Sequence, residues 1–439
     1  MFLTRRRVLL WTALAVAAFS PAAVGALPAS LAAAPLAALF AFSAYAFTSA
    51  PRGRPARSAL VLLSCCLALT LFDLAARPVL LYLYDRDRPT AALLRRWPPL
   101  PLLPRYVPGV SFEGVTYGDL AARAGRRDWR EPRRVRLVSD AYGFRNEPPV
   151  ADASARPLDV ILLGDSFAAS TTTSQEYLLS TVLARDYGLS VYNLSVSAES
   201  PQQEYATLLL EGGRLKTREG TRILWLLFAG NDLDDIYYPE LENPRPNPHP
   251  DWPSLPRRLA TRLQNFRADS PVRRLLTPGA GDPVVEREFL DGRPLLFLDS
   301  YARRRTRTAD DVRRHPNFAS LEATFVAMKR LADERRLSVS VALVPSKEEV
   351  YAWALDGRPP WTSSREPSGF SAVLSDLCAR QSFRFLDLKP ALVEASRRVY
   401  EESGALVWWR DDSHWNAAGQ RIAAAAVYEQ LLECADRGL

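Results

Sequence analysis

Short apolar runs that alternate with amphipathic segments constrain the fold of this 439-residue chain more than any other feature. Five runs of strand length follow one another toward the C-terminus. They are LDVILL at 158–163, VYNLSV at 191–196, RILWLLFAG at 222–230, SVSVALVP at 338–345 and FRFLDL at 383–388. Apolar strands separated by helical crossovers are typical of a parallel sheet that is buried on both faces. The pattern therefore predicts an α/β fold, a three-layer αβα domain over 157–439.

The segments between the runs add detail to this prediction. Helical patterns lie at 177–188, 200–215, 317–335 and 416–434. A Pro-rich insertion is expected near 236–312. Within it, VVEREFL and RPLLFL flank an Asp291-Gly292 pair, which is typical of a β-hairpin turn.

The first 85 residues indicate a separate membrane region. From Val8 to Ala50 the chain carries no charge over 43 residues, about twice the ~20 that one bilayer crossing needs. Basic clusters at 5–7 and 52–57 flank this stretch, and the positive-inside rule places both on the cytoplasmic side. We therefore predict three transmembrane helices within 1–85. They lie near 8–26, 30–49 and 58–80.

Two alternatives for this region remain open. The third apolar run, 58–84, is interrupted by Asp73 and Arg77 and could lie on the membrane surface as an interfacial helix. The large domain would then stay in the cytoplasm, whereas three full spans place it on the opposite side. A cleaved signal peptide with its apolar core at 8–19 would also imply export, but it leaves residues 20–50 unexplained.

Charge is distributed unevenly along the chain. Residues 1–150 contain 20 Lys and Arg against 9 Asp and Glu, whereas the remainder contains 36 against 40. Since nucleic-acid binding needs a basic face on the folded domain, this balance argues against a nucleic-acid partner. Between 86 and 156 the chain is rich in Pro and Arg, which predicts a connecting segment with little core of its own.

Candidate catalytic residues follow the predicted strands. Ser166 in GDSF comes directly after the first strand, at the turn into a helix whose N-terminus can stabilise negative charge. Asn231 in AGND follows the third strand, where its carboxamide can donate to an oxyanion. His414 in RDDSHWN precedes the last helix, and either Asp411 or Asp412 is close enough to orient its imidazole. Because the carboxyl ends of parallel strands meet at one edge, we expect Ser166, Asn231 and His414 to converge there.

The remaining histidines and the cysteines indicate no metal site. His249 lies in a Pro-rich stretch and His315 near a helix start, so both are expected at the surface. Three scattered histidines provide no ligand pair at helical spacing, and we expect neither a metal nor another cofactor. Cys378 and Cys434 could form a bridge in an exported domain, although two buried free thiols are the simpler interpretation.

The Ser, Asn and Asp/His elements resemble the SGNH (GDSL-type) hydrolase superfamily over roughly 137–435. The details are most similar to a membrane-attached bacterial subgroup related to alginate O-acetyltransferase-like proteins. The residues that carry this closer resemblance are Asp140, Gly143, Phe144, Arg145 and Asn146 before the first strand, and His414, Trp415, Asn416 and Gly419 at the last helix.

The resemblance implies a role for each candidate residue. Ser166 would be the nucleophile, with its own backbone amide and Asn231 as oxyanion donors. His414 would be the general base, and Asp411 would orient it in the superfamily pattern Asp-x-x-His. The subgroup often has Asp-x-His instead, which would select Asp412, and the sequence does not separate the two.

The chain departs from the family pattern at two glycines. Ala198 in NLSVSAES and Ala229 in AGND stand where glycine is usual. An alanine amide can still donate, so Ala198 remains a candidate oxyanion donor, but its loop is then expected to avoid positive φ. Weaker substrate-binding candidates are Asp232, Arg145 and Lys347. Lys347 lies in a PSKEEVY segment that is similar to the same subgroup, and a solvated lysine is the alternative there.

These features predict a membrane-anchored serine acyl-ester enzyme that acts through an acyl-enzyme, either an O-acetyltransferase or an esterase. The resemblance implies a cell-envelope or secreted polysaccharide as substrate, on the extracytoplasmic side of the bacterial inner membrane, with the lipid bilayer as a further partner. Three spans are too few to carry acetyl groups across a bilayer, so a transferase would need a separate multi-spanning acyl-donor protein. The alternative is a non-catalytic, membrane-tethered glycan-binding or scaffold protein, which the missing glycines favour.

Overall fold

The computed structural model describes most of the chain after residue 88. Within 89–433 it leaves out 98–99, 101, 149, 151, 153–155, 236, 242–243 and 245–281. The predicted membrane region 1–85 with its three spans lies outside the described residues, as do His249 and Cys434. Among the described helices, none combines the length and the apolar character that crossing a bilayer requires. The membrane region therefore stays a prediction.

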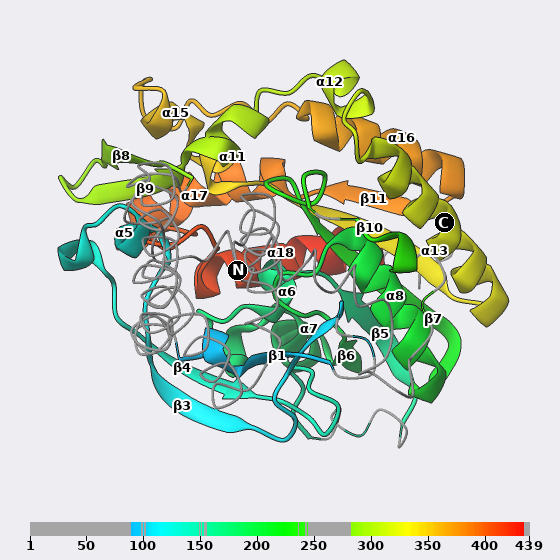
Figure 1. Ribbon diagram of the computed structural model, residues 1–439. Coiled ribbons are helices and arrows are strands. Elements are labelled where there is room, and N and C mark those ends of the chain that lie inside the picture. The colour runs from blue at the N-terminus through cyan, green and yellow to red at the C-terminus, as the bar shows by residue number, and fades with distance from the viewer. Residues whose placement is uncertain are drawn as a thin grey trace, which may run out of the picture. The chain divides into compact units, whose positions relative to one another are not determined.

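A five-stranded parallel sheet forms the centre of the domain (Figure 1). Its strands are β5 (Leu158–Leu163), β6 (Val191–Asn193), β7 (Thr217–Phe228), β10 (Ser338–Val344) and β11 (Arg384–Asp387). They correspond to the five apolar runs, although β6 is shorter than its run and β7 begins earlier. Every neighbouring pair in the order β11-β10-β7-β5-β6 is parallel. The expected α/β fold with a parallel sheet is confirmed.

The strand order contains a switch point between β5 and β7. The chain steps from β5 outward to β6, returns past β5 to β7, and then continues outward to β10 and β11. Open α/β sheets bind their ligands at such a point, beyond the carboxyl ends of the strands. Ser166 follows β5 and Asn231 follows β7, so both lie at the switch point.

Helices cover both faces of the sheet and make the three layers. One face carries α8 (Pro201–Glu211), α13 (Phe318–Arg335) and α16 (Gly369–Gln381), and the other carries α7 (Leu179–Tyr187), α17 (Lys389–Ser403) and α18 (Ala417–Val427). Residues of β7 alternate between the two cores, because successive side chains of a strand point to opposite faces. Ile223 and Trp225 pack with α13, whereas Leu224 and Leu226 pack with α18.

The segment 86–156 is folded against the domain and is more than a connection. Two antiparallel pairs, with a short helix before the last strand, make up its regular structure. They are β1 (Leu94–Arg96) with β2 (Pro104–Tyr106), and β3 (Ser111–Thr116) with β4 (Arg133–Val138), and the helix is α5 (Leu120–Arg123). Tyr106, Leu137 and Phe144 join the core on the α13 face. The reading as a mere connection is corrected, because burial alternates along β4 although Pro and Arg dominate the composition. The buried side chains join cores shared with the rest of the domain, so the expectation of little core of its own is not contradicted.

The turn that begins at Asp140 docks this segment onto β6. The Asp140 carboxylate accepts from the side-chain amide of Asn146 at 3.0 Å. Asn146 also donates to the carbonyl oxygen of Asn193 at 3.0 Å and accepts from its N–H at 2.9 Å. Gly143 has φ +82°, and a Cβ there would lie 2.4 Å from the carbonyl oxygen of Tyr106. The turn therefore requires glycine for both its conformation and its close approach.

After residue 281 the insertion continues with the expected hairpin. β8 (Val284–Glu288) pairs antiparallel with β9 (Pro294–Leu298) around Asp291 and Gly292. Leu296 donates its N–H to the carbonyl oxygen of Arg410 at 3.1 Å, which joins the hairpin to the loop before His414. Two short helices follow, α11 (Asp299–Arg304) and α12 (Ala309–Arg313).

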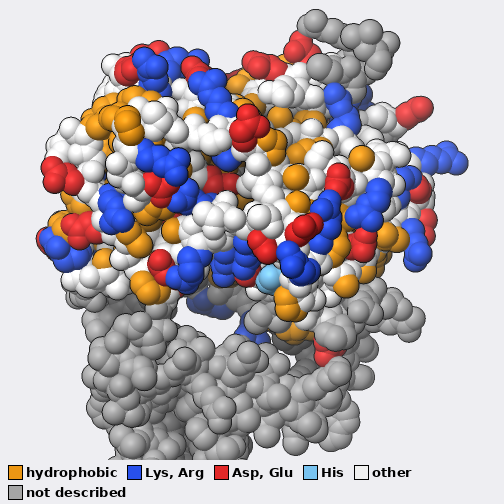
Figure 2. Space-filling view, turned by 90° about the horizontal axis from the view of Figure 1, so that it is seen from above, with side chains coloured by type: hydrophobic (Ala, Val, Ile, Leu, Met, Phe, Trp, Pro, Cys, Tyr) orange, Lys and Arg blue, Asp and Glu red, His pale blue; other side chains and the backbone are white. Residues whose placement is uncertain are grey.

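Charged side chains of both signs are interspersed on the face of the domain shown in Figure 2. Exposed ion pairs occur along the described chain, for example Arg134 with Glu113 and Arg397 with Glu401. Such pairs contribute about 0–1 kcal/mol each, because water screens them and long side chains lose freedom. The two apolar cores therefore stabilise the domain far more than its surface arginines do.

Replacing Gly143 with alanine tests whether the turn that begins at Asp140 docks onto β6 as described. Positive φ costs an alanine about 1–2 kcal/mol, and the contact with the Tyr106 carbonyl adds strain, so Gly143→Ala should lower the free energy of unfolding by about 2–4 kcal/mol. Gly109 has φ +66° with nothing within 4 Å of a Cβ, so Gly109→Ala is a matched control that should lose only about 1–2 kcal/mol. Urea unfolding followed by circular dichroism measures both, and equal losses would contradict the docking role.

Candidate active site

Ser166 and His414 form a hydrogen bond across 248 residues of sequence. Ser166 begins the short helix α6 (Ser166–Ala169) directly after β5, and Asp165 caps it by accepting from the N–H of Phe167 at 2.8 Å. The Nε2 atom of His414 lies 2.7 Å from the Ser166 hydroxyl oxygen. A hydroxyl at this distance can donate to a neutral imidazole, which is the geometry that a general base requires.

Asp412 extends this pair to a Ser–His–Asp arrangement. Its Oδ1 atom lies 2.5 Å from Nδ1 of His414 and also accepts the His414 backbone N–H at 3.0 Å. With the Nδ1 hydrogen directed at this carboxylate, Nε2 can accept the proton of Ser166. Asp411 instead accepts from two backbone N–H groups of the segment before the domain, each at 3.0 Å. Of the two aspartates, the structure therefore brings Asp412 to His414.

Nearby carboxylates set the basicity of His414. Burial lowers the pKa of the imidazole, but the charge of Asp412 and its hydrogen bond outweigh burial, and Asp119 and Asp165 act in the same direction. The pKa of His414 is therefore raised above its usual 6.5. A general base must be neutral, so a reaction that depends on it slows as the pH falls through this raised value.

The residues around His414 fix its loop against the Ser166 helix. Trp415 and Gln420 both donate to the carbonyl oxygen of Phe167, at 3.0 Å and 3.1 Å. The Asn416 side chain caps α18 by accepting from two backbone N–H groups of its first turn. In the His-Trp-Asn sequence, His414 is thus the candidate base, Trp415 donates to the carbonyl oxygen of the residue after Ser166, and Asn416 caps the helix.

Asn231 lies at the expected edge of the sheet, but its amide is engaged. Its Nδ2 atom donates to the carboxylate of Asp235 at 3.0 Å and 3.1 Å. Arg304 donates to the carbonyl oxygen of Gly230 at 2.7 Å, and Asn317 donates to that of Asp235 at 2.9 Å, so the loop is held on two sides. An amide nitrogen carries two hydrogens, which leaves one for an oxyanion.

Ala198 has φ +67°, whereas its loop was expected to avoid positive φ. That expectation is wrong. Neighbouring bonds hold the turn: Val196 donates to the carbonyl oxygen of Gly164 at 3.2 Å, and Glu199 donates to that of Val196 at 3.3 Å. The backbone therefore keeps a conformation that favours glycine, at a cost of about 1–2 kcal/mol for an alanine.

Lys347 is neither a substrate contact nor a solvated lysine, so both interpretations are corrected. It begins the short helix α14 (Lys347–Val350) after β10 and is fully buried. Its Nζ atom donates to the carbonyl oxygens of Trp409 at 3.1 Å, Arg410 at 3.3 Å and Asp412 at 2.6 Å. Burial lowers its pKa to about 8. Lys347 thus holds the loop that carries Asp412.

Arg145 and Asp232 are also fully buried, so the structure contradicts their assignment as substrate-binding residues. Arg145 donates to the carbonyl oxygens of Ala169 at 2.9 Å and Thr173 at 3.2 Å, which fixes the loop after Ser166. Burial lowers its pKa to about 10. Asp232 accepts the N–H of Phe228 at 2.7 Å and so closes the turn after β7.

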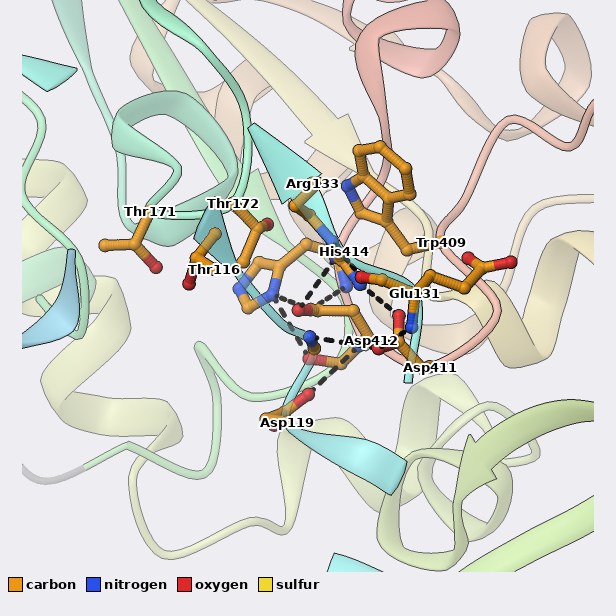
Figure 3. A network of polar contacts seen from close by, with 12 residues as sticks. Thr116, Asp119, Glu131, Arg133, Thr171, Thr172, Trp409, Asp411, Asp412 and His414 are labelled. Atoms are coloured by element: carbon orange, nitrogen blue, oxygen red, sulfur yellow. Dashed lines mark hydrogen bonds and ion pairs between the residues drawn. The ribbon is translucent and has the colours of Figure 1, made fainter. Parts of the chain in front are cut away.

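Sequence reasoning missed the residues that the segment before the domain contributes to the site. The guanidinium of Arg133 donates from Nη1 to Oδ2 of Asp412 at 3.4 Å, and Asp119 accepts the N–H of Ser413 at 3.3 Å (Figure 3). The sequence RRVRLV could have indicated this contribution, because it has the alternation of a strand in which Arg133 points inward and Arg134 points outward.

Metal and disulfide chemistry were not expected. Among residues 89–433 as far as they are described, no group of three or more His, Cys, Asp and Glu is placed to hold a metal ion. Cys378 is buried with a free thiol, and its possible partner Cys434 lies outside the described residues. The expectation that the protein needs no cofactor remains a prediction.

Comparison with known proteins supports the resemblance. Residues 296–437, about a third of the chain, match the family model for an SGNH hydrolase-like domain, acetyltransferase AlgX. This match includes Asp412 and His414 but not Ser166 or Asn231. No curated protein matches the chain significantly. A solved structure, protein YxiM of Bacillus subtilis, is 9% identical with a TM-score of 0.34, covers 71% of this chain and 70% of its own, and carries no argument at that level.

Replacing Ala198 with glycine should stabilise the protein by about 1 kcal/mol, because glycine adopts positive φ without the clash of a Cβ. Ala141 is an exposed alanine without positive φ, so Ala141→Gly is the matched control and should lose a few tenths to 1 kcal/mol. Urea unfolding measures both changes. A loss of stability in Ala198→Gly would contradict the strained conformation.

The pKa values of His414 and His315 should lie on opposite sides of 6.5. The pKa of His414 is raised, whereas burial lowers that of His315 although Asp234 partly offsets it. With only three histidines in the chain, NMR of histidine-labelled protein separates their signals once His414→Gln has identified one of them. Asp412→Asn should bring the His414 midpoint down, because the carboxylate that raises it is gone. A midpoint for His414 below 6.5 in the unaltered protein would contradict the geometry.

Proposed function

We propose that this chain, which carries an SGNH hydrolase-like domain of the AlgX acetyltransferase type over 296–437, is a serine acyl-ester enzyme that acts on a polysaccharide. The observation that carries the proposal is the contact of Ser166 with His414 at 2.7 Å and of His414 with Asp412 at 2.5 Å. A nucleophile, a base within hydrogen-bond reach and a group that orients the base make up the minimum for covalent acyl transfer.

In the first half of the reaction, the Ser166 oxygen attacks the carbonyl carbon of the acyl ester while its proton passes to Nε2 of His414. The carbonyl oxygen becomes an oxyanion, for which the Ser166 amide, the Ala198 amide and the second amide hydrogen of Asn231 are the candidate donors. The bond to the leaving alcohol then breaks, and His414 returns the proton to that alcohol. Ser166 is left as an acyl ester.

In the second half, water or a sugar hydroxyl gives its proton to His414 and attacks the acyl carbon. The bond from that carbon to the Ser166 oxygen then breaks, and His414 returns the proton to Ser166. If water is the acceptor, the product is a free acid, and if a sugar hydroxyl is the acceptor, the product is an acylated sugar. Esterase and transferase therefore differ only in the acceptor. For transfer on an exported polysaccharide, a separate multi-spanning membrane protein would supply the acyl group.

The proposed location follows from the uncharged N-terminal stretch. Residues 1–85 would anchor the protein in the inner membrane through three spans, with the domain on the extracytoplasmic side. This arrangement would place Ser166 on the side where envelope and secreted polysaccharides are modified.

Two observations favour a second candidate, a membrane-tethered glycan-binding or scaffold protein without turnover. The Asn231 amide is bonded to Asp235, and Ala198 stands in a conformation that suits glycine. The first occupies one hydrogen of a candidate oxyanion donor, and the second strains the loop of another, and each donor is worth about 3–4 kcal/mol in acyl-transfer enzymes.

The deciding experiment uses the full-length chain, purified in detergent, with an aryl acetate as the acyl donor. We expect release of the aryl alcohol and labelling of Ser166 by a fluorophosphonate, and Ser166→Ala should lose the labelling and at least about a thousandfold of the rate. Ser403 is an exposed serine whose hydroxyl donates to the carbonyl oxygen of Val399 at 2.7 Å and accepts from the N–H of Ala405 at 3.3 Å, so Ser403→Ala is the matched control. Equal rates in Ser166→Ala and the unaltered protein, with no label on either, would favour the scaffold.

A further inference from the structure

We propose that Arg133 is a positioning residue of the candidate triad: it holds the second oxygen of Asp412, so that the first oxygen stays on His414. This inference rests on the proposed function. Arg133 comes from β4, in the segment before the domain, and its side chain is 3% exposed. The Asp412 side chain is fully buried, so water cannot take over this role.

The two oxygens of Asp412 have separate partners. Oδ1 contacts both the Nδ1 atom and the backbone N–H of His414. Oδ2 accepts from Nη1 of Arg133 at 3.4 Å. A carboxylate bound on one side only can rotate about its last torsion, whereas donors on both oxygens fix its plane.

Arg133 also prevents a conflict between two adjacent buried acids. Its Nη2 atom donates to Oδ1 of Asp411, whose side chain is 1% exposed. Two neighbouring buried carboxylates repel each other, and one of them would take up a proton unless a cation balances them. Burial raises the pKa of Asp411, the charge of Arg133 opposes this rise, and the charge of Asp412 adds to it. Without Arg133, Asp411 is therefore the acid that takes up a proton, while Asp412 stays the charged partner of His414.

Arg133 is itself held in place. Its guanidinium carbon lies 4.2 Å from the ring centre of Trp409, and its Nε atom donates to the carbonyl oxygen of Glu131 at 3.3 Å. Figure 3 shows Arg133, Asp411, Asp412 and His414 in one network. An arginine used only to neutralise surface charge would not be fixed by a ring and a carbonyl at the same time.

The charge of Arg133 should be visible in the titration of His414. The ionisable groups around the imidazole and its carboxylate are Asp412, Asp411, Asp119, Asp165, Lys347 and Arg133. Removing a cation from Oδ2 leaves more of the negative charge of Asp412 to stabilise protonated His414. The pKa of His414 should therefore rise when Arg133 is lost.

The test compares variants of the full-length chain in two measurements. Arg133→Met should lower kcat for the aryl acetate about ten- to a hundredfold with KM within about twofold, since Arg133 acts through Asp412. The acid limb of kcat and the NMR midpoint of His414 should both move to higher pH. Arg133→Lys keeps the charge and should restore the midpoint. Arg134→Met, in the outward neighbour on the same strand, should match the unaltered protein.

Arg133→Met leaves two buried carboxylates without their cation and could fail to fold. The double variant Arg133→Met with Asp411→Asn removes one charge of each sign, so it keeps the balance of the site. It should show the same loss of kcat and a smaller upward shift, because the lost charge of Asp411 partly offsets the lost charge of Arg133. An unchanged midpoint in either folded variant would overturn the inference, even if kcat falls with stability. If the unaltered protein lacks turnover, the proposed function fails, while the NMR midpoint still decides the role of Arg133.

Discussion

The hydrogen bond from the Ser166 hydroxyl to the His414 imidazole depends on the parallel sheet, on its strand order and on the two apolar cores. It joins the end of the first sheet strand to the loop before the last helix. A parallel sheet brings such distant points to one edge, because all its strands end on the same side. The strand order then puts β5 and β7 beside each other at the switch point. The apolar cores on the two faces hold that edge in shape.

Burying charge is the main energetic problem of the site. Asp411, Asp412, Arg133 and Lys347 are nearly or fully excluded from water. Isolated, each would cost several kcal/mol, and the cost is offset only where opposite charges and hydrogen bonds surround every group. Here arginine pairs with both acids, and lysine donates to three carbonyl oxygens. The arrangement leaves His414 as the ionisable group that retains some exposure.

The sequence predicted the elements whose signal is local and repeated. Five apolar runs became five strands, and Ser166, directly after β5, came into contact with His414 in the loop before α18. Asp411 and Asp412 could not be separated, since a turn of the backbone decides which carboxylate meets the imidazole. The burial of Lys347 could not be predicted either, because its partners are main-chain carbonyls, which every residue type has. The role of Arg133 was missed because the Pro- and Arg-rich composition of 86–156 suggested a linker.

The candidate site depends on the β3–β4 region as well as on the sheet domain that follows it. The stretch that matches a known family begins at 296, and the sheet begins at 158, yet the site is braced by strands that precede both. Residues that resemble a tether in sequence are part of the candidate active site. A truncation or fusion placed at the start of the sheet would remove these bracing strands, so the strands and the sheet form one unit.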